Sequence, residues 1–498
     1  MAQWKTLGGG ALLAVLLGST SVHADVSAEE VWQSWVDYYA SMGQVLSAES
    51  QEQSGDTLVV TGAKVSTEMP EGSFETTISE VRLRDLGDGR VEITIPEEIP
   101  LNVVTKPETG ETVEMTMILR QTGMSTIVSG SADDMTYDMT APELAIAMEG
   151  ATVDDETFPF DLNVVMTGNV AQYRMTGTDA REITSTFSTD SLAFDMAAND
   201  PEGGGTFTAS GEMSALTGSS TATMPGNVDM QDLVAALKAG FAVDGNFTYA
   251  GGSYSFDVQD EAESMQLSAT GAGGSLDFAM SEDGLSYGGT GGASEMTIAG
   301  AQVPFPINIT LAESAFRLAM PIVKSDDSKP FGLVLKLVDL SLPEELWGMF
   351  DPTGQLPHDP ATLIVDVSGE AKLTAEIFDP EQAAEMTEAP GELNALDVNE
   401  VRIKAVGAEL SGQGGFTFDN SDMSMGYPKP LGALDLSLTG ANALLDKLVA
   451  MGLLPEDQAM GARMMMGMFA VPAGEDALTS KIEFREDGGL YANGQRLQ

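Results

Sequence analysis

The sequence predicts a mainly β (α+β) fold, in which long curved antiparallel sheets carry an N-terminal helix and a C-terminal helical hairpin. Residues 56–226 alternate apolar and polar side chains with period two, which is typical of strands that have one buried face. Residues 27–46 and 441–469 instead repeat apolar residues at helical spacing. The small residues on the strands (Gly, Ala, Ser and Thr) favour strong curvature of the sheets.

Residues 1–24 have the pattern of a secretory signal peptide. A single positive charge, Lys5, precedes the apolar run Ala11–Leu17, and Val22–Ala24 places small or medium-sized residues where a signal peptidase reads them. The apolar run is too short for a transmembrane helix, and no later run is long enough to span a bilayer. We therefore expect cleavage after Ala24 and a periplasmic mature chain without a transmembrane segment.

Residues 25–50 are predicted to contain an amphipathic helix of about five turns. Ser27 and Glu30 have the spacing of a capping box at its start. The apolar stripe of this helix consists of Val31, Trp32, Trp35, Tyr38, Tyr39, Met42, Val45 and Leu46. We expect the stripe to pack in the core. The alternative is a membrane-facing or ligand-facing stripe, but the polar side of the helix carries acids and no lysine, which argues against a membrane interface.

Residues 51–228 are predicted to form a first β-rich half. Apolar and polar residues alternate in Val91–Ile95, Met115–Leu119 and Leu192–Met196, and turn signals such as Gly87–Gly89 separate such runs. This pattern indicates many short antiparallel strands with one buried and one solvated face. Residues 229–300 are expected to form a short helix, Asp229–Ala239, with Asp229 as its cap, followed by a β-meander.

Residues 301–498 are predicted to form a second β-rich half. Its expected elements are a helix at 343–350, a pair of strands at 362–367 and 371–377, a helical turn at 380–386, a helical hairpin of 441–450 with 456–469, and a terminal β-hairpin at 480–494. No Pro-rich or Ser-rich linker interrupts the strands, so we expect one elongated body made of two similar β halves.

The composition excludes several chemistries. The chain has no cysteine, so it has no thiolate nucleophile, no cysteine-held metal and no lipoprotein anchor. His358 is the only histidine after the signal peptide, which excludes a zinc site with two histidines. His358 lies between two prolines, and we expect it to be an exposed or capping loop residue rather than part of a serine hydrolase triad.

The chain is strongly acidic, with 76 acidic and 23 basic residues and a formal net charge of −53. This charge repels nucleic acid and anionic headgroups, so no nucleic-acid partner is expected. An acidic, solvated surface is the preferred interpretation, and we predict no cofactor. Ca²⁺ is the alternative, at Asp133–Asp134, Asp154–Glu156 or Asp419–Asp422, although none of these clusters has the spacing of an EF-hand.

The second helix of the predicted hairpin is rich in methionine. Thioethers can bind Cu(I), but neighbouring residues of a helix point in different directions, so we expect flexible apolar packing and no metal site. A further hypothesis is that this helix lines an adaptable groove for an acyl chain or a partner. The candidate groove residues are Met460, Met464, Met465, Met468 and Phe469.

Several motifs resemble domain-of-unknown-function family 2125, a family of exported alphaproteobacterial proteins. They are Leu346–Pro352, Leu356–Leu363, Asn442–Asp446, Leu453–Pro455 and Asn493–Gln495, together with the Trp32/Trp35 helix after a signal peptide. The resemblance spans the mature chain and is strongest at its two ends. The family has no established activity and therefore implies no catalytic residue. The C-terminal end also resembles YdgA-like and, more remotely, AsmA-like envelope proteins, which favours a role with lipid or the envelope.

These observations support three functions, in the following order. The first is a non-enzymatic envelope protein that binds an apolar ligand or lipid in a β-groove. The second is a structural or protein-interaction component of the periplasm. The third is a hydrolase that uses two carboxylates, which would need one carboxyl with a raised pKa in an open cleft.

Overall fold

The structure is a computed structural model of the chain. It describes residues 25–42, 44–69, 72–105, 110, 112–154, 156–178, 180–200, 204–226, 228, 232–260, 264–378, 390–423 and 426–497. The predicted signal peptide, the proposed cap Asp229 and the predicted helical turn at 380–386 lie outside these residues.

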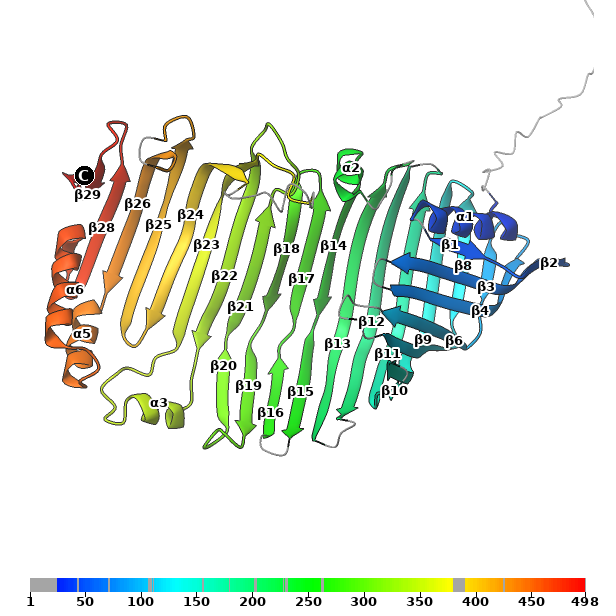
Figure 1. The fold of residues 1–498 in the computed structure, drawn as a ribbon, viewed down its shortest axis with the longest axis horizontal. Helices are drawn as coiled ribbons and strands as arrows, with labels where there is room; N and C mark the ends of the chain where they lie inside the picture. Colours follow the sequence, from blue (N-terminus) through cyan, green and yellow to red (C-terminus); the bar gives the residue numbers. More distant parts are fainter. Residues whose placement is uncertain are drawn as a thin grey trace, which may run out of the picture.

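The described residues form one antiparallel sheet of 30 strands, which confirms the mainly β class (Figure 1). The strands up to residue 224 are β1 (Val45–Ser47), β2 (Ser50–Ser54), β3 (Thr57–Met69), β4 (Gly72–Asp85), β5 (Val91–Thr94), β6 (Glu98–Thr105), β7 (Val113–Thr122), β8 (Ser125–Ser131), β9 (Asp134–Val153), β10 (Glu156–Thr157), β11 (Phe160–Thr176), β12 (Arg181–Asn199) and β13 (Gly205–Met224).

The following strands are β14 (Ala242–Tyr249), β15 (Gly251–Asp260), β16 (Ser264–Gly271), β17 (Gly274–Ser281), β18 (Gly284–Gly291), β19 (Ser294–Gly300), β20 (Ile307–Leu311), β21 (Glu313–Met320), β22 (Lys329–Leu340), β23 (Ala361–Leu373), β24 (Gly391–Ala405), β25 (Ala408–Asp419), β26 (Lys429–Thr439), β27 (Val471–Gly474), β28 (Ala477–Phe484), β29 (Leu490–Ala492) and β30 (Gln495–Arg496). The helices are α1 (Ala28–Ser41), α2 (Leu233–Lys238), α3 (Glu344–Phe350), α5 (Ala441–Ala450) and α6 (Glu456–Phe469).

The sheet is a ladder of neighbours from β3 to β28. In its middle, two short strands follow each other along one long strand: β14 and β15 both pair with β13. At the next three positions two short strands again lie end to end: β17 and β16, then β18 and β19, then β21 and β20. β21 then pairs with the long strand β22. The sheet therefore stays continuous although its middle strands are short.

Many strands are longer than the sequence pattern predicts. β9 and β13 each have 20 residues, and β23 is one strand where a pair of strands, 362–367 and 371–377, was expected. In β23 the cause is two register shifts in its pairing with β24, one between Asp366 and Val367 and one between Glu370 and Ala371. A bulge shifts the phase of the alternation without ending the strand, so one strand looks like two in the sequence.

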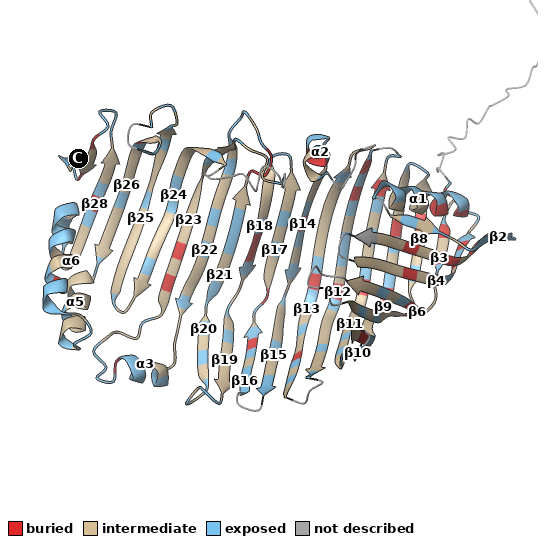
Figure 2. Cartoon of the chain, viewed as in Figure 1, coloured by how far each residue is buried: buried red, intermediate tan, exposed pale blue. Residues whose placement is uncertain are grey.

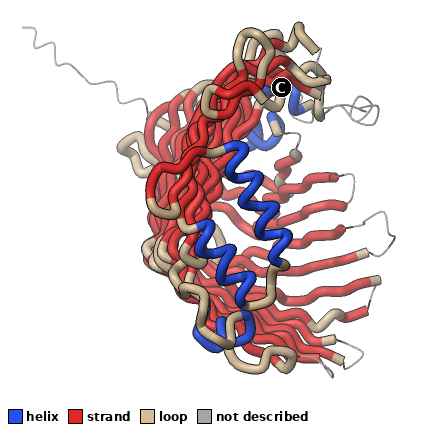
Figure 3. Tube along the Cα trace, turned by 90° about the vertical axis from the view of Figure 1, so that its left-hand side faces the viewer, coloured by secondary structure: helices blue, strands red, loops and turns tan. Residues whose placement is uncertain are grey.

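The sheet curves into a trough, and the helices lie on its hollow side (Figures 1 and 3). At the N-terminal end, α1 packs on the hollow face through Val31 and Trp32, which contact a cluster that includes Val60, Leu83 and Val91. Figure 2 shows that buried residues concentrate at this end. A smaller cluster of Leu237, Ile322 and Val323 lies under α2.

Two of the helix boundaries correct the sequence prediction. The capping box of α1 is confirmed: the Ser27 side chain accepts a hydrogen bond from the Glu30 N–H, and the Glu30 carboxylate accepts one from the Ser27 N–H. However, α1 has 14 residues, about four turns, and Val45 and Leu46 belong to β1 because the chain leaves the helix after Ser41.

The short helix α2 also begins later than predicted, at Leu233. Its N-cap is Asp232, whose carboxylate accepts a hydrogen bond from the Ala235 N–H. The C-terminal helical hairpin has the predicted bounds, and the terminal β-hairpin of β28 and β29 is confirmed. The Ser480 hydroxyl donates a hydrogen bond of 2.6 Å to the Phe469 carbonyl, which fixes the end of α6 against β28.

The N-terminal end of the sheet should be more sensitive to loss of an apolar side chain than its middle. We expect Leu83→Ala, in the cluster under α1, to lower the free energy of unfolding by about 2–5 kcal/mol because it leaves a cavity. Leu333→Ala, on an uncovered part of the same face, should cost about 1 kcal/mol or less. Urea unfolding followed by circular dichroism measures both costs, and equal costs would contradict this difference.

Candidate functional site

The hollow face of the sheet is apolar along its whole length. Residues that are paired across neighbouring strands share a face, so the register defines rows of side chains. One row begins at Tyr137 under α1 and continues through Tyr173, Ser185, Ser220, Gly245, Phe278, Tyr287, Leu318, Leu333 and Val367. The next row runs through Met139, Ala171, Phe187, Gly218, Phe247, Leu276, Gly289, Phe316, Leu335, Val365 and Val401.

We call the part of these rows between β12 and β24 the apolar trough. Its large side chains are unusually exposed for the apolar face of a sheet: Phe316 is 40% exposed, Leu333 44% and Tyr287 47%. By contrast, Val60 and Leu83, under α1, are fully buried. The difference follows from the architecture, because α2 packs on the middle strands only near one end, at Met280, Leu285 and Met320, and no described element covers the two rows there (Figure 1).

Glycines within the rows let aromatic rings lie along the floor of the trough. A Cβ atom on Gly245 would lie 2.6 Å from the Phe278 ring, and one on Gly218 would lie 2.4 Å from the Phe187 ring. Each ring therefore covers its neighbouring glycine instead of standing upright. The result is a smooth apolar floor.

Two adjoining hollows lie in the trough. One has a volume of about 630 Å³ and the other of about 550 Å³, and both are lined by Met213 and Tyr249. The first also contacts Phe256 and Met296, and the second contacts Phe316. Both volumes fall within the range of about 300–1,000 Å³ that is common for small-molecule sites.

A third cavity, of about 490 Å³, lies between α1 and the sheet. Half of its lining residues are aromatic residues or methionine, and nearly all the others are aliphatic. The aromatic residues and methionines include Trp32, Trp35, Tyr38, Tyr39, Tyr137, Tyr173, Met139 and Met175. Burial raises the pKa of Tyr137 and Tyr173 above the ordinary value, so both phenols are neutral near pH 7.

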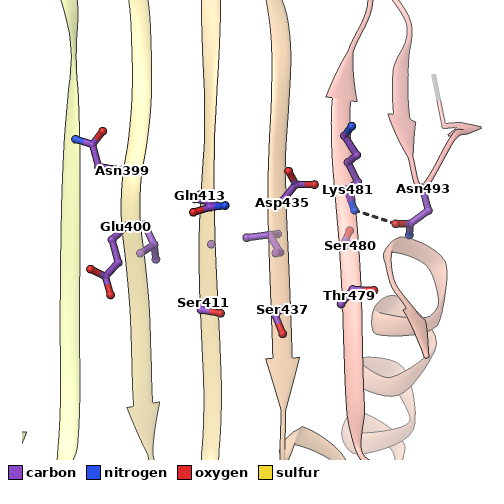
Figure 4. Close-up of a pocket in the computed structure, with 13 residues that line it drawn as sticks. Asn399, Glu400, Ser411, Gln413, Asp435, Ser437, Thr479, Ser480, Lys481 and Asn493 are labelled. Carbon is purple, nitrogen blue, oxygen red and sulfur yellow. Dashed lines mark hydrogen bonds between the residues drawn. The ribbon is translucent and has the colours of Figure 1, made fainter. Parts of the chain in front are cut away.

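The opposite, convex face of the sheet is polar. A shallow hollow of about 650 Å³ lies between β24 and β29, and Figure 4 shows the side chains that line it. Its labelled side chains include Gln413, Asp435 and Ser437, and the Lys481 backbone N–H donates a hydrogen bond of 2.9 Å to the Asn493 side chain. The sheet is thus amphipathic, with its polar side toward solvent.

The candidate groove residues on α6 lie away from these cavities. Met464 is 69% exposed, and Met460, Met465 and Met468 are exposed to a similar degree, while Phe469 is 38% exposed. They line none of the three apolar cavities described above. The sequence hypothesis of a β-groove named no groove residue on the strands, because period-two alternation marks an apolar face without showing whether anything covers it.

The remaining candidates from the sequence are His358 and the possible metal sites. His358 stacks on Trp347, with ring centres 4.5 Å apart, and its Nδ1 lies 2.9 Å from a Glu344 carboxylate oxygen, so it links a loop to α3. Among the described residues, no three histidine or acidic side chains gather in a way that could hold a metal ion. In the same part of the chain, no helix combines the length and the apolarity that crossing a bilayer requires.

Two aspartates show how hydrogen bonds lower carboxyl pKa values here. A hydrogen bond from Arg174 lowers the pKa of Asp134. Backbone hydrogen bonds from Ala443 and Asn442 lower the pKa of Asp476, which thereby binds the start of α5. Neither carboxyl has the raised pKa that a general acid needs.

Asp476 gives the helical hairpin a predictable pH dependence. Because its pKa is lower in the folded chain, its stabilising effect is complete above the ordinary pKa and is lost as the pH falls through the folded pKa. We expect Asp476→Asn to lower the free energy of unfolding by about 0.3–1 kcal/mol at pH 7. The difference from the wild type should shrink in acid. Urea unfolding at neutral and acidic pH tests this, with Glu475→Gln as control, and a pH-independent difference would contradict it.

The comparisons with known proteins give a family and no closer relative. The family described as "Uncharacterized protein conserved in bacteria (DUF2125)" matches residues 195–497. No curated protein and no solved structure matches the chain. The matched part includes the C-terminal motifs named above, whereas α1 and the strands before β12 lie outside it. Because the match covers more than half of the sequence, the chain belongs to the DUF2125 family.

Proposed function

We propose that this chain is an exported, non-enzymatic envelope protein that holds the acyl chain of a lipid in the apolar trough. The exported location rests on the signal-peptide pattern of residues 1–24, and the envelope supplies acyl chains to such a protein. The proposal concerns the concave face of the sheet, not the methionines of α6.

The single observation that carries the proposal is the uncovered apolar face. Proteins normally bury such a face against a second layer of helices or strands, and large exposed apolar patches mark binding surfaces. Here Phe316, Leu333 and Tyr287 keep 40–47% of their surface exposed. Each buried methylene contributes about 0.8 kcal/mol, so an acyl chain lying in the trough would gain most of its binding free energy from this floor.

The chemistry of the floor favours an acyl chain over a polar ligand. The rows between β14 and β24 offer aromatic rings, aliphatic side chains and glycine, and the sheet already pairs their backbone groups. The two serines of the first row, Ser185 and Ser220, form a hydrogen bond of 2.7 Å between their hydroxyls. A ligand here meets apolar contacts and few hydrogen-bond partners.

A role as a structural or protein-interaction component is the second candidate. The observation that favours it is the edge of the sheet: all five residues of β2 are exposed, and within the described chain β2 pairs only with β3. An exposed edge strand can pair with a strand of another protein. The carboxylate hydrolase has no comparable support, since Asp134 and Asp476 have lowered pKa values.

Native mass spectrometry tests the proposal directly. The mature chain should be purified from the periplasm without detergent. We expect a discrete additional mass that disappears on extraction with organic solvent and that lipid analysis identifies as acyl-containing. A mass equal to that of the bare chain would overturn the proposal and favour the search for a protein partner by crosslinking in the envelope.

Substitutions on the two faces of β22 provide a matched test. Leu333→Asn places an amide on the trough floor and should weaken binding of a fluorescent fatty acid by about tenfold. Val334→Asn makes the same kind of change on the opposite face of the same strand and should leave binding unchanged. Similar weakening by both variants would show that the effect does not come from the trough.

A further inference from the structure

One buried charged side chain on the concave face has no carboxylate partner among the described residues. Arg181 begins β12 two residues before Ile183, whose partner across the sheet is Met175, a residue of the cavity under α1. Arg181 therefore shares the apolar face, and it is only 7% exposed. In the described rows that cross β9 to β26, the other residues of this face carry no charge.

Among the residues that the structure describes, the contacts of Arg181 include no acid. Its Nη1 lies 3.4 Å from the Met175 sulfur and 3.5 Å from the Ser34 carbonyl oxygen, and its Nε lies 3.4 Å from the Thr178 carbonyl oxygen. The guanidinium carbon lies 5.9 Å from the centre of the Tyr38 ring. These are long hydrogen bonds to neutral groups and one distant cation–π contact.

The lack of an acidic partner is informative in this chain. Acidic residues outnumber basic ones 76 to 23, and exposed arginines such as Arg174 and Arg317 have carboxylate partners. A buried charge without a counter-charge lowers the stability of the fold, and an acidic partner stabilises a buried arginine more than an exposed one. The nearby phenols do not supply the charge, because burial raises the pKa of Tyr137 and Tyr173 and keeps both neutral.

The guanidinium lies directly behind the lining of the cavity under α1. Two residues that contact Arg181, namely Met175 and Tyr38, also line this cavity of about 490 Å³. The remaining lining is aromatic and aliphatic. The site thus combines a mostly apolar chamber with a buried cation behind its lining, which is the complement of an apolar chain with an anionic head.

We propose that the cavity under α1 binds a single acyl chain with an anionic head, a carboxylate or a phosphate, and that Arg181 pairs with this head. The inference rests on the proposed function and deepens it, because it assigns the head chemistry of the ligand and a second place where an acyl chain lies. The aromatic stripe of α1 then covers the chain from the side opposite the sheet.

Titration calorimetry of the full mature chain, after organic extraction, tests the inference. The probes are palmitate, palmitoyl lysophosphatidate and hexadecanol, which share a chain length and differ in the head. We expect both anions to bind about tenfold or more tightly than the neutral alcohol. Binding should also change the tryptophan fluorescence, since Trp32 and Trp35 line the cavity. Binding of only one anion would identify the head as carboxylate or as phosphate.

Arg181→Met is the decisive variant, and Arg174→Met is its control. Arg174 lies next to Met175 on the outer face and pairs with Asp134 at 2.8 Å, so its loss changes the net charge equally. Arg181→Met should lose the preference for anions while still binding hexadecanol, and its thermal stability without ligand should not fall, because an unpaired buried charge is removed. Arg174→Met should keep the preference.

Two results would overturn the inference and leave the proposed function intact. The first is equal affinity of the wild type for palmitate and hexadecanol, a comparison that needs no variant and so does not depend on the folding of Arg181→Met. The second is an unchanged preference for anions in Arg181→Met. If none of the three amphiphiles binds the wild type, the proposed function itself fails.

Discussion

The structure depends on one constraint: the sheet is a single layer, so most of its apolar face has no other part of the described chain to pack against. Backbone hydrogen bonds join the strands from β3 to β28, so that the N–H and C=O groups of each strand pair with those of its neighbours. They hold the sheet together without a second layer. Curvature and the helices at the two ends then shelter part of the apolar side chains, and the middle of the trough stays open (Figure 3).

This constraint divides the roles of the helices. α1 closes the N-terminal end by burying Val31 and Trp32 against the sheet, which forms the largest buried cluster of the described chain. α2 covers a rim of the trough at Ile322 and Val323, and the hairpin of α5 and α6 is fastened at the C-terminal end through Asp476 and Ser480. Between β14 and β24, α2 packs only on Met280, Leu285 and Met320, and no described helix covers the two rows of the trough (Figure 1).

The sequence predicts local features well because local chemistry determines them. The capping box at Ser27 and Glu30 and the bounds of α5 and α6 follow from short-range hydrogen bonds and turns. It does not predict that β23 is one strand or that Leu46 leaves the helix, because bulges and chain exit depend on distant partners. Above all, alternation in residues such as Leu333 and Leu335 predicts an apolar face, whereas its exposure depends on the absence of a covering layer.

The distribution of charge explains how such a surface can discriminate between ligands. The convex face and the loops carry most of a net charge of −53, and salt screens these charges over distances of about 10 Å. This field acts on any anion that approaches from solvent and does not distinguish one chain length from another. Arg181 differs from these surface charges because it is buried, and a charge pair is stronger in a buried site than in water. If the proposed site binds an anionic amphiphile, the surface would repel the head and Arg181 would attract it only once the tail fills the cavity, so selection for the head would require prior burial of the tail.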